Sequence, residues 1–285
     1  MSMFLEEISL KYLFIGFAAE GKQAFLEKEL DRPYFVSWNE LVIEDGEVFA
    51  KNIPISKFKF IMAGAIHDNT DMYSCVIKYI NKYKIGFLSY GTPHELENKL
   101  VQSVIMKMEG VSQIKTIIGH AGKVSCSELI KALNLPIVSK IVNGSQGKGI
   151  VKHDTKDSLS AFLNKNKDES FIFQEFIPND GDFRTFYLKD KLIYSIKRIT
   201  ASKSEFRNNV SLGGSQEFID LSKEAESLAN KACKAMGFGI TGVDLIQHSK
   251  TGKWYVMEIN AAPQFVGPEF KQVMAELVSL IKTTK

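Results

Sequence analysis

The chain has 285 residues, of which 45% are hydrophobic and 24% charged, the balance of a globular protein with two or three packed units. Its formal net charge of +3 is too small to argue for a nucleic-acid partner. The three cysteines, Cys75, Cys126 and Cys233, are odd in number and scattered along the chain, which fits a reducing cytoplasm and a role as small buried hydrophobes.

The first 90 residues alternate strand and helix signals. The apolar run YLFIGFAA follows Glu6 and Glu7, where a signal peptide would carry positive charge, and it is too short to span a bilayer. We therefore expect a buried first strand in a cytoplasmic protein that has no membrane segment.

We expect strands at 11–18, 57–66 and 84–89 and helices at 25–30 and 73–83. This alternation predicts a small parallel α/β domain over residues 1–90. The stretch GFAAEG after the first strand is not a dinucleotide fingerprint, and we assign no nucleotide to it.

A domain boundary is expected at Gly91. The sequence Thr92-Pro93-His94-Glu95 has the form of a capping box with proline at the first helical position, and this helix should end at Gly110. The remaining elements in chain order are a helix from Ser125, strands at 136–142 and 149–154, a helix at 155–165, a strand at 170–178, a hairpin at 183–199, a helix from Ser222 to Gly237, a hairpin at 241–260 and a helix from about Pro268. We expect two domains here, residues 91–173 and residues 174–285.

Two oxygen-bearing side chains end the strand WYVMEIN. Glu258 and Asn260 are two residues apart and so share one face of that strand. If the preceding turn centres near residue 251, Asp244 lies opposite Glu258, and like charges in that position are destabilising unless something neutralises them. A Mg²⁺ ion would do so, because it prefers carboxylate and carbonyl oxygens. The alternative is a solvated sheet edge that carries two unpaired acids.

The segment Lys140 to Gly149 carries three glycines in six residues, at 144, 147 and 149. Glycines let backbone N–H groups approach a polyphosphate closely, and Gly144, Ser145, Gln146 and Gly147 are the candidates. The pattern is not a Walker A loop, because Gly149 follows Lys148 where that loop needs serine or threonine. The loop lies between two predicted strands, which favours a flexible hairpin flap over phosphates. A plain hairpin turn is the alternative.

Two further features indicate ligand contacts. The stretch Gln174-Glu175-Phe176-Ile177-Pro178 takes an apolar strand into polar residues and then proline, which leaves backbone groups for the edge of an adenine ring. An ordinary strand end is the alternative. Three of the four arginines lie between residues 184 and 207, in a chain whose other basic residues are lysines. This clustering favours an anion site, with surface ion pairing as the alternative.

In this order the motifs PIVSKIVNGSQGKG, FIFQEFIPNDGDFRTF, KRITASKSEFRNNVSLGGS, TGVDLI and VMEINAAP resemble the ATP-grasp carboxylate–amine ligases, particularly the RimK-like branch that adds glutamate to protein tails. The resemblance covers residues 92–270. It implies an ATP-grasp fold, in which two α+β subdomains grip ATP, preceded by the small parallel α/β domain.

The resemblance also assigns roles to residues. Lys99 and Lys140 would contact the ATP phosphates, Glu175, Phe176 and Ile177 the adenine, and Asp182 the ribose. Arg207 and Asn209 would lie by the terminal phosphate, and Asp244, Glu258 and Asn260 would bind Mg²⁺, or Mn²⁺ in its place. Arg184 and Arg198 are candidates to hold the substrate carboxylate or the acyl phosphate.

Two departures from the family pattern stand out. The family follows the metal-binding asparagine with Ala-Ser-Pro-Gly, whereas this chain has Ala261-Ala262-Pro263-Gln264 on the acceptor side. The stretch between Glu175 and Asp182 is also shorter than in the family.

The predicted function is an ADP-forming ligase that joins the carboxylate of an amino acid, peptide or protein to an amine through an acyl phosphate. The alternatives are a kinase on the same scaffold and a non-catalytic ATP-binding regulator. A homo-oligomer is compatible with the resemblance, since family members commonly form dimers or tetramers.

Overall fold

The computed structural model describes residues 10–17, 19–93, 98–142, 149–199, 215–265 and 267–284. It divides into two compact units. The first unit comprises residues 1–94, 238–241 and 261–285, and the second comprises residues 95–237 and 242–260. The last 25 residues thus group with the N-terminal segment, whereas the sequence analysis joined them to residue 174 onward. The boundary between residues 173 and 174 stays a prediction. Within the described part of the chain, no helix combines the length and the apolar character needed to cross a membrane.

The first unit is built on a parallel four-stranded sheet, as predicted. Its strand order is β2-β1-β6-β7, and every neighbouring pair runs parallel. A separate three-stranded antiparallel sheet, β3-β4-β5, was not predicted. The elements of this unit are β1 (Tyr12–Ile15), α1 (Glu20–Glu29), β2 (Tyr34–Val36), β3 (Leu41–Glu44), β4 (Glu47–Ala50), β5 (Ile53–Pro54), β6 (Phe60–Gly64), α2 (Thr70–Tyr83), β7 (Gly86–Tyr90) and α8 (Phe270–Thr283).

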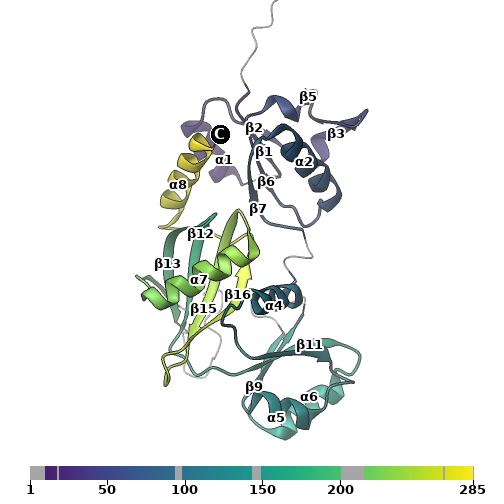
Figure 1. Ribbon diagram of the computed structural model, residues 1–285, viewed down its shortest axis with the longest axis vertical. Coiled ribbons are helices and arrows are strands. Elements are labelled where there is room, and N and C mark those ends of the chain that lie inside the picture. Colours follow the sequence, from purple (N-terminus) through teal and green to yellow (C-terminus); the bar gives the residue numbers. More distant parts are fainter. Residues whose placement is uncertain are drawn as a thin grey trace, which may run out of the picture. The chain divides into compact units, whose positions relative to one another are not determined.

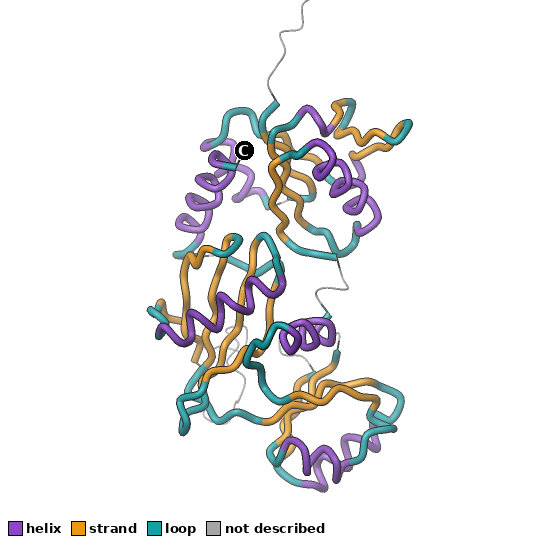
Figure 2. The backbone as a smooth tube through the Cα atoms, in the orientation of Figure 1, coloured by secondary structure: helices purple, strands orange, loops and turns teal. Residues whose placement is uncertain are grey.

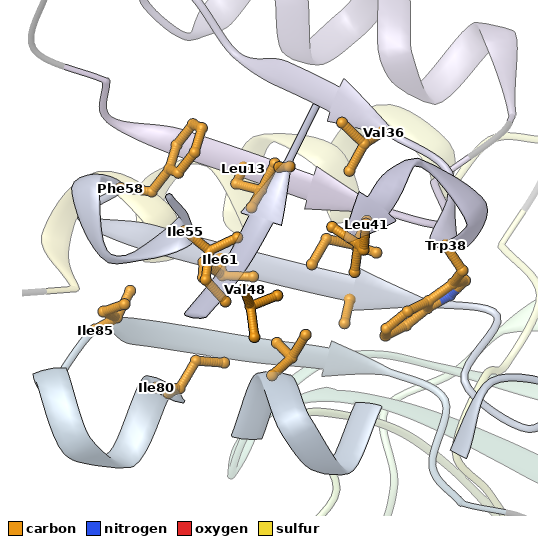
Figure 3. Close-up of a cluster of buried hydrophobic side chains, with 14 of the residues drawn as sticks. Leu13, Val36, Trp38, Leu41, Val48, Ile55, Phe58, Ile61, Ile80 and Ile85 are labelled. Carbon is orange, nitrogen blue, oxygen red and sulfur yellow. The ribbon is translucent and has the colours of Figure 1, made fainter. Parts of the chain in front are cut away.

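The side chains of β1 point alternately to the two faces of this parallel sheet, and they are apolar on both faces, which explains why helices cover both. Leu13 and Ile15 point into a core that α2 and the small sheet complete (Figure 3). Phe14, between them, stacks on Phe35 from β2 at a centroid distance of 5.0 Å. Figure 1 shows α1 and α8 together on one side of the sheet and α2 on the other.

Gly16 ends β1 at a point that admits no side chain. Its φ is +66°, and a Cβ there would lie 2.5 Å from the Gly64 carbonyl oxygen and 2.5 Å from Nε1 of Trp38. The indole of Trp38 occupies the space beside Gly16, and its Nε1 donates a 2.8 Å hydrogen bond to the Gly64 carbonyl. The chain therefore leaves the sheet here and enters α1.

The second unit contains two sheets. The first has the order β10-β9-β11-β8, antiparallel throughout, with α5 and α6 on one face (Figure 1). Phe171 and Phe173 of β11 are buried against these helices. Its elements are β8 (Thr116–His120), α5 (Cys126–Leu133), β9 (Ile137–Ile141), β10 (Ile150–His153), α6 (Lys156–Lys165) and β11 (Ser170–Glu175). The predicted hairpin around the glycine loop is confirmed in its strands, since Ile150 pairs with Lys140.

The second sheet has the order β14-β13-β12-β15-β16, and α7 crosses one of its faces (Figure 2). Ser222 caps α7 by accepting a hydrogen bond from the Ala225 amide, and Gly237 ends it in the left-handed conformation, as predicted. The elements are α4 (Lys99–Met108), β12 (Asp182–Leu188), β13 (Lys191–Ile199), β14 (Ser215–Phe218), α7 (Lys223–Met236), β15 (Ile240–Gln247) and β16 (Trp254–Asn260).

The predicted start of the helix after Gly91 differs from the structure. Thr92 and Pro93 are not helical, and the other two residues of the expected capping box lie outside the described residues. In the described part, α4 begins at Lys99, and Asn98 caps it through its side-chain oxygen, 2.8 Å from the Leu100 amide. The helix ends before Gly110, as predicted.

Candidate functional site

Four side chains that the sequence singled out separately line one pocket in the second unit. They are Lys99 from α4, Lys140 from β9, Gln174 from β11 and Glu258 from β16. The pocket holds about 410 Å³ of space, part of it open to solvent. Its other lining residues are Gln102, Ser103, Met106, Gln113, Thr116, Ile172, Val256 and Met257.

Two ammonium groups and one carboxylate set the charge of this pocket. The Lys99 Nζ lies 3.7 Å from the Glu258 Oε1. Burial lowers the pKa of Lys140, Glu258 opposes that shift, and Lys99 adds to it. A polyanion entering the pocket would relieve the repulsion between the two lysines, so the arrangement suits phosphate groups.

Gln174 presents an unused acceptor to the same pocket. Its side chain is buried, and its Nε2 donates a 2.9 Å hydrogen bond to the Thr116 hydroxyl. Its buried Oε1 has no hydrogen-bond partner. Because buried polar atoms are normally satisfied, this oxygen is available to a donor group of a ligand.

Gln102 is the main residue that the sequence analysis missed. It is 3% exposed and locks the end of β16, because its Nε2 donates to the Ile259 carbonyl at 2.8 Å and its Oε1 accepts from the Ile259 amide at 3.3 Å. Gln102 lies one turn after Lys99 on α4, so it holds the lysine's helix against the strand that carries Glu258. A glutamine on the apolar face of that helix was the available signal.

The predicted register of the last hairpin is confirmed: Asp244 pairs directly with Glu258, and Gly242 with Asn260. Asp244, which is 4% exposed, is neutralised by arginines from β12 and β13. Arg184 donates from Nε to Oδ1 and from Nη2 to Oδ2, both at 2.7 Å, and Arg198 Nη2 lies 3.1 Å from Oδ2. Burial alone would raise the pKa of Asp244, but these ion pairs outweigh it and hold that pKa below its ordinary value.

Asp182 belongs to the same cluster. It is 2% exposed, and its Oδ1 accepts a short hydrogen bond from the Arg198 Nε. Burial raises the pKa of Asp182, and Arg198 opposes that shift. The three predicted ligand contacts Asp182, Arg184 and Arg198 are thus paired with one another and with Asp244, so their predicted contacts with ribose and substrate carboxylate stay predictions.

The donor set at the end of β16 fits a magnesium ion. Asp244 and Glu258 face each other as oxygen donors, and the Nδ2 of Asn260 is buried without a hydrogen-bond partner, so its amide is free to reorient. A carboxylate has about four lone-pair positions. The arginines use three of those on Asp244, which leaves one on Oδ1. Among the described residues, no group of three or more His, Cys, Asp and Glu side chains could hold a metal, and the predicted set of two carboxylates and one amide is not of that kind.

The expected adenine-binding stretch lies at the end of β11. The amide of Glu175 donates to the Lys115 carbonyl at 3.2 Å, and the amide of Phe176 donates to the Pro136 carbonyl at 3.1 Å. These two N–H groups are therefore already paired within the protein, and the expected contact of this stretch with adenine stays a prediction. The Lys152 Nζ lies 4.6 Å from the centre of the Phe176 ring, and Ile177 is buried beside Ile114.

Six other predicted contacts lie outside the described residues. They are Gly144, Ser145, Gln146 and Gly147 of the glycine loop, together with Arg207 and Asn209. Their roles stay predictions.

The model of the RimK-like ATP-grasp domain matches residues 97–279 of this chain. A probable alpha-L-glutamate ligase of Cellvibrio japonicus (strain Ueda107) is 34% identical over 177 residues, which are 60% of this chain and 58% of that protein. A protein of the same description from Parasynechococcus marenigrum (strain WH8102) is 30% identical over 212 residues, 72% of this chain and 44% of that protein. The chain therefore spans about half the length of these relatives.

Solved structures show the same fold at low identity. The ATP-grasp ligase PsnB complexed with a minimal precursor superposes with a TM-score of 0.75 at 16% identity, over 98% of this chain and 100% of that one. The D-alanine–D-alanine ligase of Bacillus anthracis complexed with ATP gives 0.64 at 18% identity, over 97% and 96%. The predicted ATP-grasp fold is confirmed, and the chain belongs to the RimK-like ATP-grasp family.

Proposed function

We propose that this protein is an ATP-dependent, ADP-forming ligase that joins a carboxylate to an amine. The observation that carries the proposal is the pocket in which Lys99, Lys140, Gln174 and Glu258 converge from four different elements. The names of the similar proteins support it: the curated relatives are probable alpha-L-glutamate ligases, and the neighbouring structures are an ATP-grasp ligase and a D-alanine–D-alanine ligase complexed with ATP. The substrates are accordingly an amino acid, peptide or protein carboxylate and an amine.

The reaction proceeds in two balanced steps. A carboxylate oxygen of the first substrate attacks the γ-phosphorus of ATP, the bond from that phosphorus to the β-phosphate oxygen breaks, and ADP leaves. The nitrogen of the amine then attacks the acyl carbon, the C–O bond to the phosphoryl group breaks, and phosphate leaves while the nitrogen loses a proton. No protein nucleophile is required, so the protein acts by positioning groups and neutralising charge.

Different residues of the chain bind different parts of the nucleotide. Lys99 and Lys140 hold the phosphates, together with the predicted phosphate contacts Gly144, Ser145, Gln146 and Gly147. Glu175, Phe176 and Ile177 bind the adenine, with Gln174 beside them offering its unpaired Oε1 to a nucleotide donor, and Asp182 binds the ribose. Arg207 and Asn209 lie by the terminal phosphate.

Two buried arginines hold the carboxylates of Asp182 and Asp244 in place through ion pairs. Arg184 and Arg198 keep Asp244 ionised and fixed, and they are the candidates to hold a substrate carboxylate or acyl phosphate. Asp244, Glu258 and Asn260 would hold Mg²⁺, with Mn²⁺ as a substitute. When bound, the metal would neutralise charge on the phosphate oxygens of the nucleotide.

The experiment is incubation with Mg²⁺-ATP and pooled amino acids and peptides, followed by phosphorus NMR and mass spectrometry. We expect ADP, phosphate and a mass gain equal to one condensation. A phosphorylated acceptor would mean a kinase, and AMP with pyrophosphate would rule out the acyl phosphate. ATP binding without turnover of any substrate would favour the regulatory alternative.

Two variants connect this activity to the pocket. Glu258→Ala combined with Asn260→Ala should abolish product formation, and Lys140→Met should weaken ATP binding roughly 10- to 100-fold, the range for losing one charge-assisted hydrogen bond. Lys165→Met, at the exposed end of α6, is the matched control and should leave both unchanged. Unaltered ATP-dependent condensation in the double variant would contradict the proposal.

A further inference from the structure

Thr116 and Gln174 lie directly opposite each other on the antiparallel strands β8 and β11, and both line the pocket. Residues in this relation share one face of the sheet, so their side chains are neighbours. The Nε2 of Gln174 lies 2.9 Å from the Thr116 hydroxyl, and that hydroxyl lies 2.7 Å from the backbone carbonyl oxygen of Ile114. The three groups therefore form a chain of hydrogen bonds that ends in the pocket.

The direction of this chain is set by the Thr116 hydroxyl, which has a single proton. Two oxygens 2.7 Å apart need a proton between them, and the Ile114 carbonyl can only accept, so the hydroxyl donates to it. The hydroxyl then has only lone pairs left for Gln174, and the end of the Gln174 amide that faces it must be the NH₂ group. As a consequence, the oxygen end of that amide is directed away from Thr116.

The acceptor that receives the Thr116 proton is held in place by its surroundings. Ile114 is buried and packs in a cluster with Ile177. The next residue, Lys115, accepts a 3.2 Å hydrogen bond from the Glu175 amide, which joins the same two segments through their backbones. The Ile114 carbonyl is therefore a fixed acceptor that keeps the Thr116 hydroxyl directed at it.

The oxygen end of the Gln174 amide is an unused acceptor. Within the part of the chain that the structure describes, the buried Oε1 of Gln174 accepts no hydrogen bond. Leaving a buried acceptor unsatisfied costs free energy, so the pocket favours a ligand that places a donor group at this point. A ligand with an acceptor there would bring lone pairs against those of Oε1 and is disfavoured.

Gln174 lies at the end of the pocket where the base of a nucleotide is expected. Lys140, a predicted phosphate contact, pairs with Ile172, which precedes Gln174 by two residues or about 7 Å along β11. From Lys140 the strand β9 continues away from Gln174, and the glycine loop follows it in the sequence. The predicted adenine contacts, residues 175–177, instead follow Gln174 directly. A nucleotide whose phosphates contact Lys140 thus directs its base toward Gln174.

We propose that Thr116 is a positioning residue that fixes the Gln174 amide and so makes the site select a 6-aminopurine over a 6-oxopurine nucleotide. This inference rests on the proposed function in that ATP is the nucleotide. Adenine carries an NH₂ donor at C6, whereas guanine and hypoxanthine carry an oxygen acceptor there. With Oε1 directed at the ligand, Gln174 favours the donor. Without the Thr116 hydroxyl, the amide is free to rotate and present its NH₂ group to an oxo group, so the selectivity is lost.

The test is a calorimetric titration of the full chain with Mg²⁺-ATP and with Mg²⁺-ITP (inosine triphosphate), which has an oxo group at C6. We expect the wild type to bind ATP roughly 10- to 100-fold more tightly than ITP, the range for one buried polar atom left unsatisfied. Thr116→Val should bring the two affinities close together, whereas Thr116→Ser, which keeps the hydroxyl, should retain the preference. Thr116→Cys, whose thiol is a weak hydrogen-bonding group, should reproduce the loss and replaces the valine variant where that protein does not fold. Ser170→Ala, which removes an exposed hydroxyl at the start of β11, is the matched control.

A double-variant cycle shows whether Thr116 acts through Gln174. Gln174→Met removes both ends of the amide, so it should abolish the preference for ATP, and adding Thr116→Val should then change the ratio of affinities no further. A preference for ATP that survives Gln174→Met and is lost only on adding Thr116→Val would overturn the inference.

The remaining outcomes separate this inference from the ligase activity, because ADP release with pooled amino acids and peptides is measured in parallel. Selective ATP binding that depends on Thr116 supports the inference even where no ADP forms. Equal binding of ATP and ITP by the wild type overturns it, as does a Thr116→Val protein that loses affinity for both nucleotides by the same factor, the result of a merely structural role. ADP formation in those cases leaves the ligase standing. A wild-type chain that binds neither nucleotide overturns both proposals.

Discussion

The negative charge of Asp244 is neutralised by a different group from the one that the sequence predicted. Two acids opposite each other on a hairpin need a neutralising charge, and a metal ion was the predicted source. The structure provides that charge through Arg184 and Arg198, which belong to β12 and β13. Glu258 lies on the edge strand β16, and its side chain is 39% exposed with the Lys99 ammonium nearby. The pair is therefore asymmetric: one acid is held inside by arginines, and the other remains open to a ligand.

His153 offers a test at the same scale. The ring is 1% exposed, lies between the hydroxyls of Ser139 and Ser158 at 2.9 and 3.2 Å, and packs on Phe162. Burial lowers its pKa, against a weaker opposite influence from Asp154, so the folded state favours the neutral ring. The unfolded chain then binds more protons, and stability falls as the pH drops.

We expect the contribution of His153 to be complete above about pH 6.5, the ordinary histidine pKa, and to be lost as the pH falls through the lowered folded pKa. His153→Gln should flatten this part of the pH dependence, although it also lowers stability at neutral pH by removing a packed ring. Urea unfolding at a series of pH values between about 5 and 8 measures both effects. A variant whose stability falls as steeply as that of the wild type would contradict the assignment.

At the scale of elements, α4 and β16 are joined by one side chain. Gln102 satisfies both backbone groups of Ile259, at a position where the strand is buried and where water cannot replace the glutamine. The strand end that carries Glu258 and Asn260 is thereby fixed to the helix that carries Lys99.

Gln102→Leu should lower the free energy of unfolding by about 2–6 kcal/mol, because it leaves a buried N–H and a buried carbonyl unsatisfied at about 1–3 kcal/mol each. It should also weaken ATP binding, since Lys99 and Glu258 lose their fixed separation. Met108→Ala on the same helix, where the side chain is 78% exposed, should change stability by less than about 0.5 kcal/mol. Chemical denaturation and nucleotide titration provide the two measurements, and equal behaviour of the two variants would show that the glutamine does not hold the strand.

The elements that the sequence predicted well are those specified by nearby residues. The last hairpin and its register follow from a local turn around residue 251 and from strand alternation, and α7 is bounded by its own serine and glycine caps. The short strands β8 and β14 were missed, because pairing with segments farther along the chain stabilises them more than composition does. The small sheet β3-β4-β5 was also missed, although it consists of local hairpins between strands of two to four residues. The pairing of Asp244 with Arg184 was hidden for the same reason, since it depends on β12 lying beside β15.

At the scale of the whole molecule, each unit contains one of the two tryptophans. Trp38 belongs to the core of the first unit, and Trp254 lies in β16 of the second. Both are buried, so the fluorescence of each reports the packing of its own unit. Trp38→Phe and Trp254→Phe thus give two single-reporter proteins that follow the units separately.

Leu277→Ala tests the role of α8 in the first unit. The buried face of this helix is formed by Val273, Met274, Leu277, Val278 and Ile281. Removing the Leu277 side chain, which is fully buried, should cost about 2–5 kcal/mol. We expect the transition reported by Trp38 to move to lower denaturant while that reported by Trp254 moves much less. Equal shifts at both reporters would mean that the two units unfold as one.

Because the first unit is made of segments from both ends of the sequence, it cannot finish folding until the last of them has been synthesised. Its sheet is encoded by the first 90 residues, but α8, which packs on α1, is encoded by residues 270–283. During translation the ribosome therefore completes the second unit's segments, through residue 260, before the N-terminal sheet receives its final helix. Until then Phe25 of α1 lacks its later contact with the Phe270 ring, and the part of α1 that α8 covers remains exposed. The nascent chain must keep that surface from aggregating, so the N-terminal segment is where we expect chaperones to bind during synthesis.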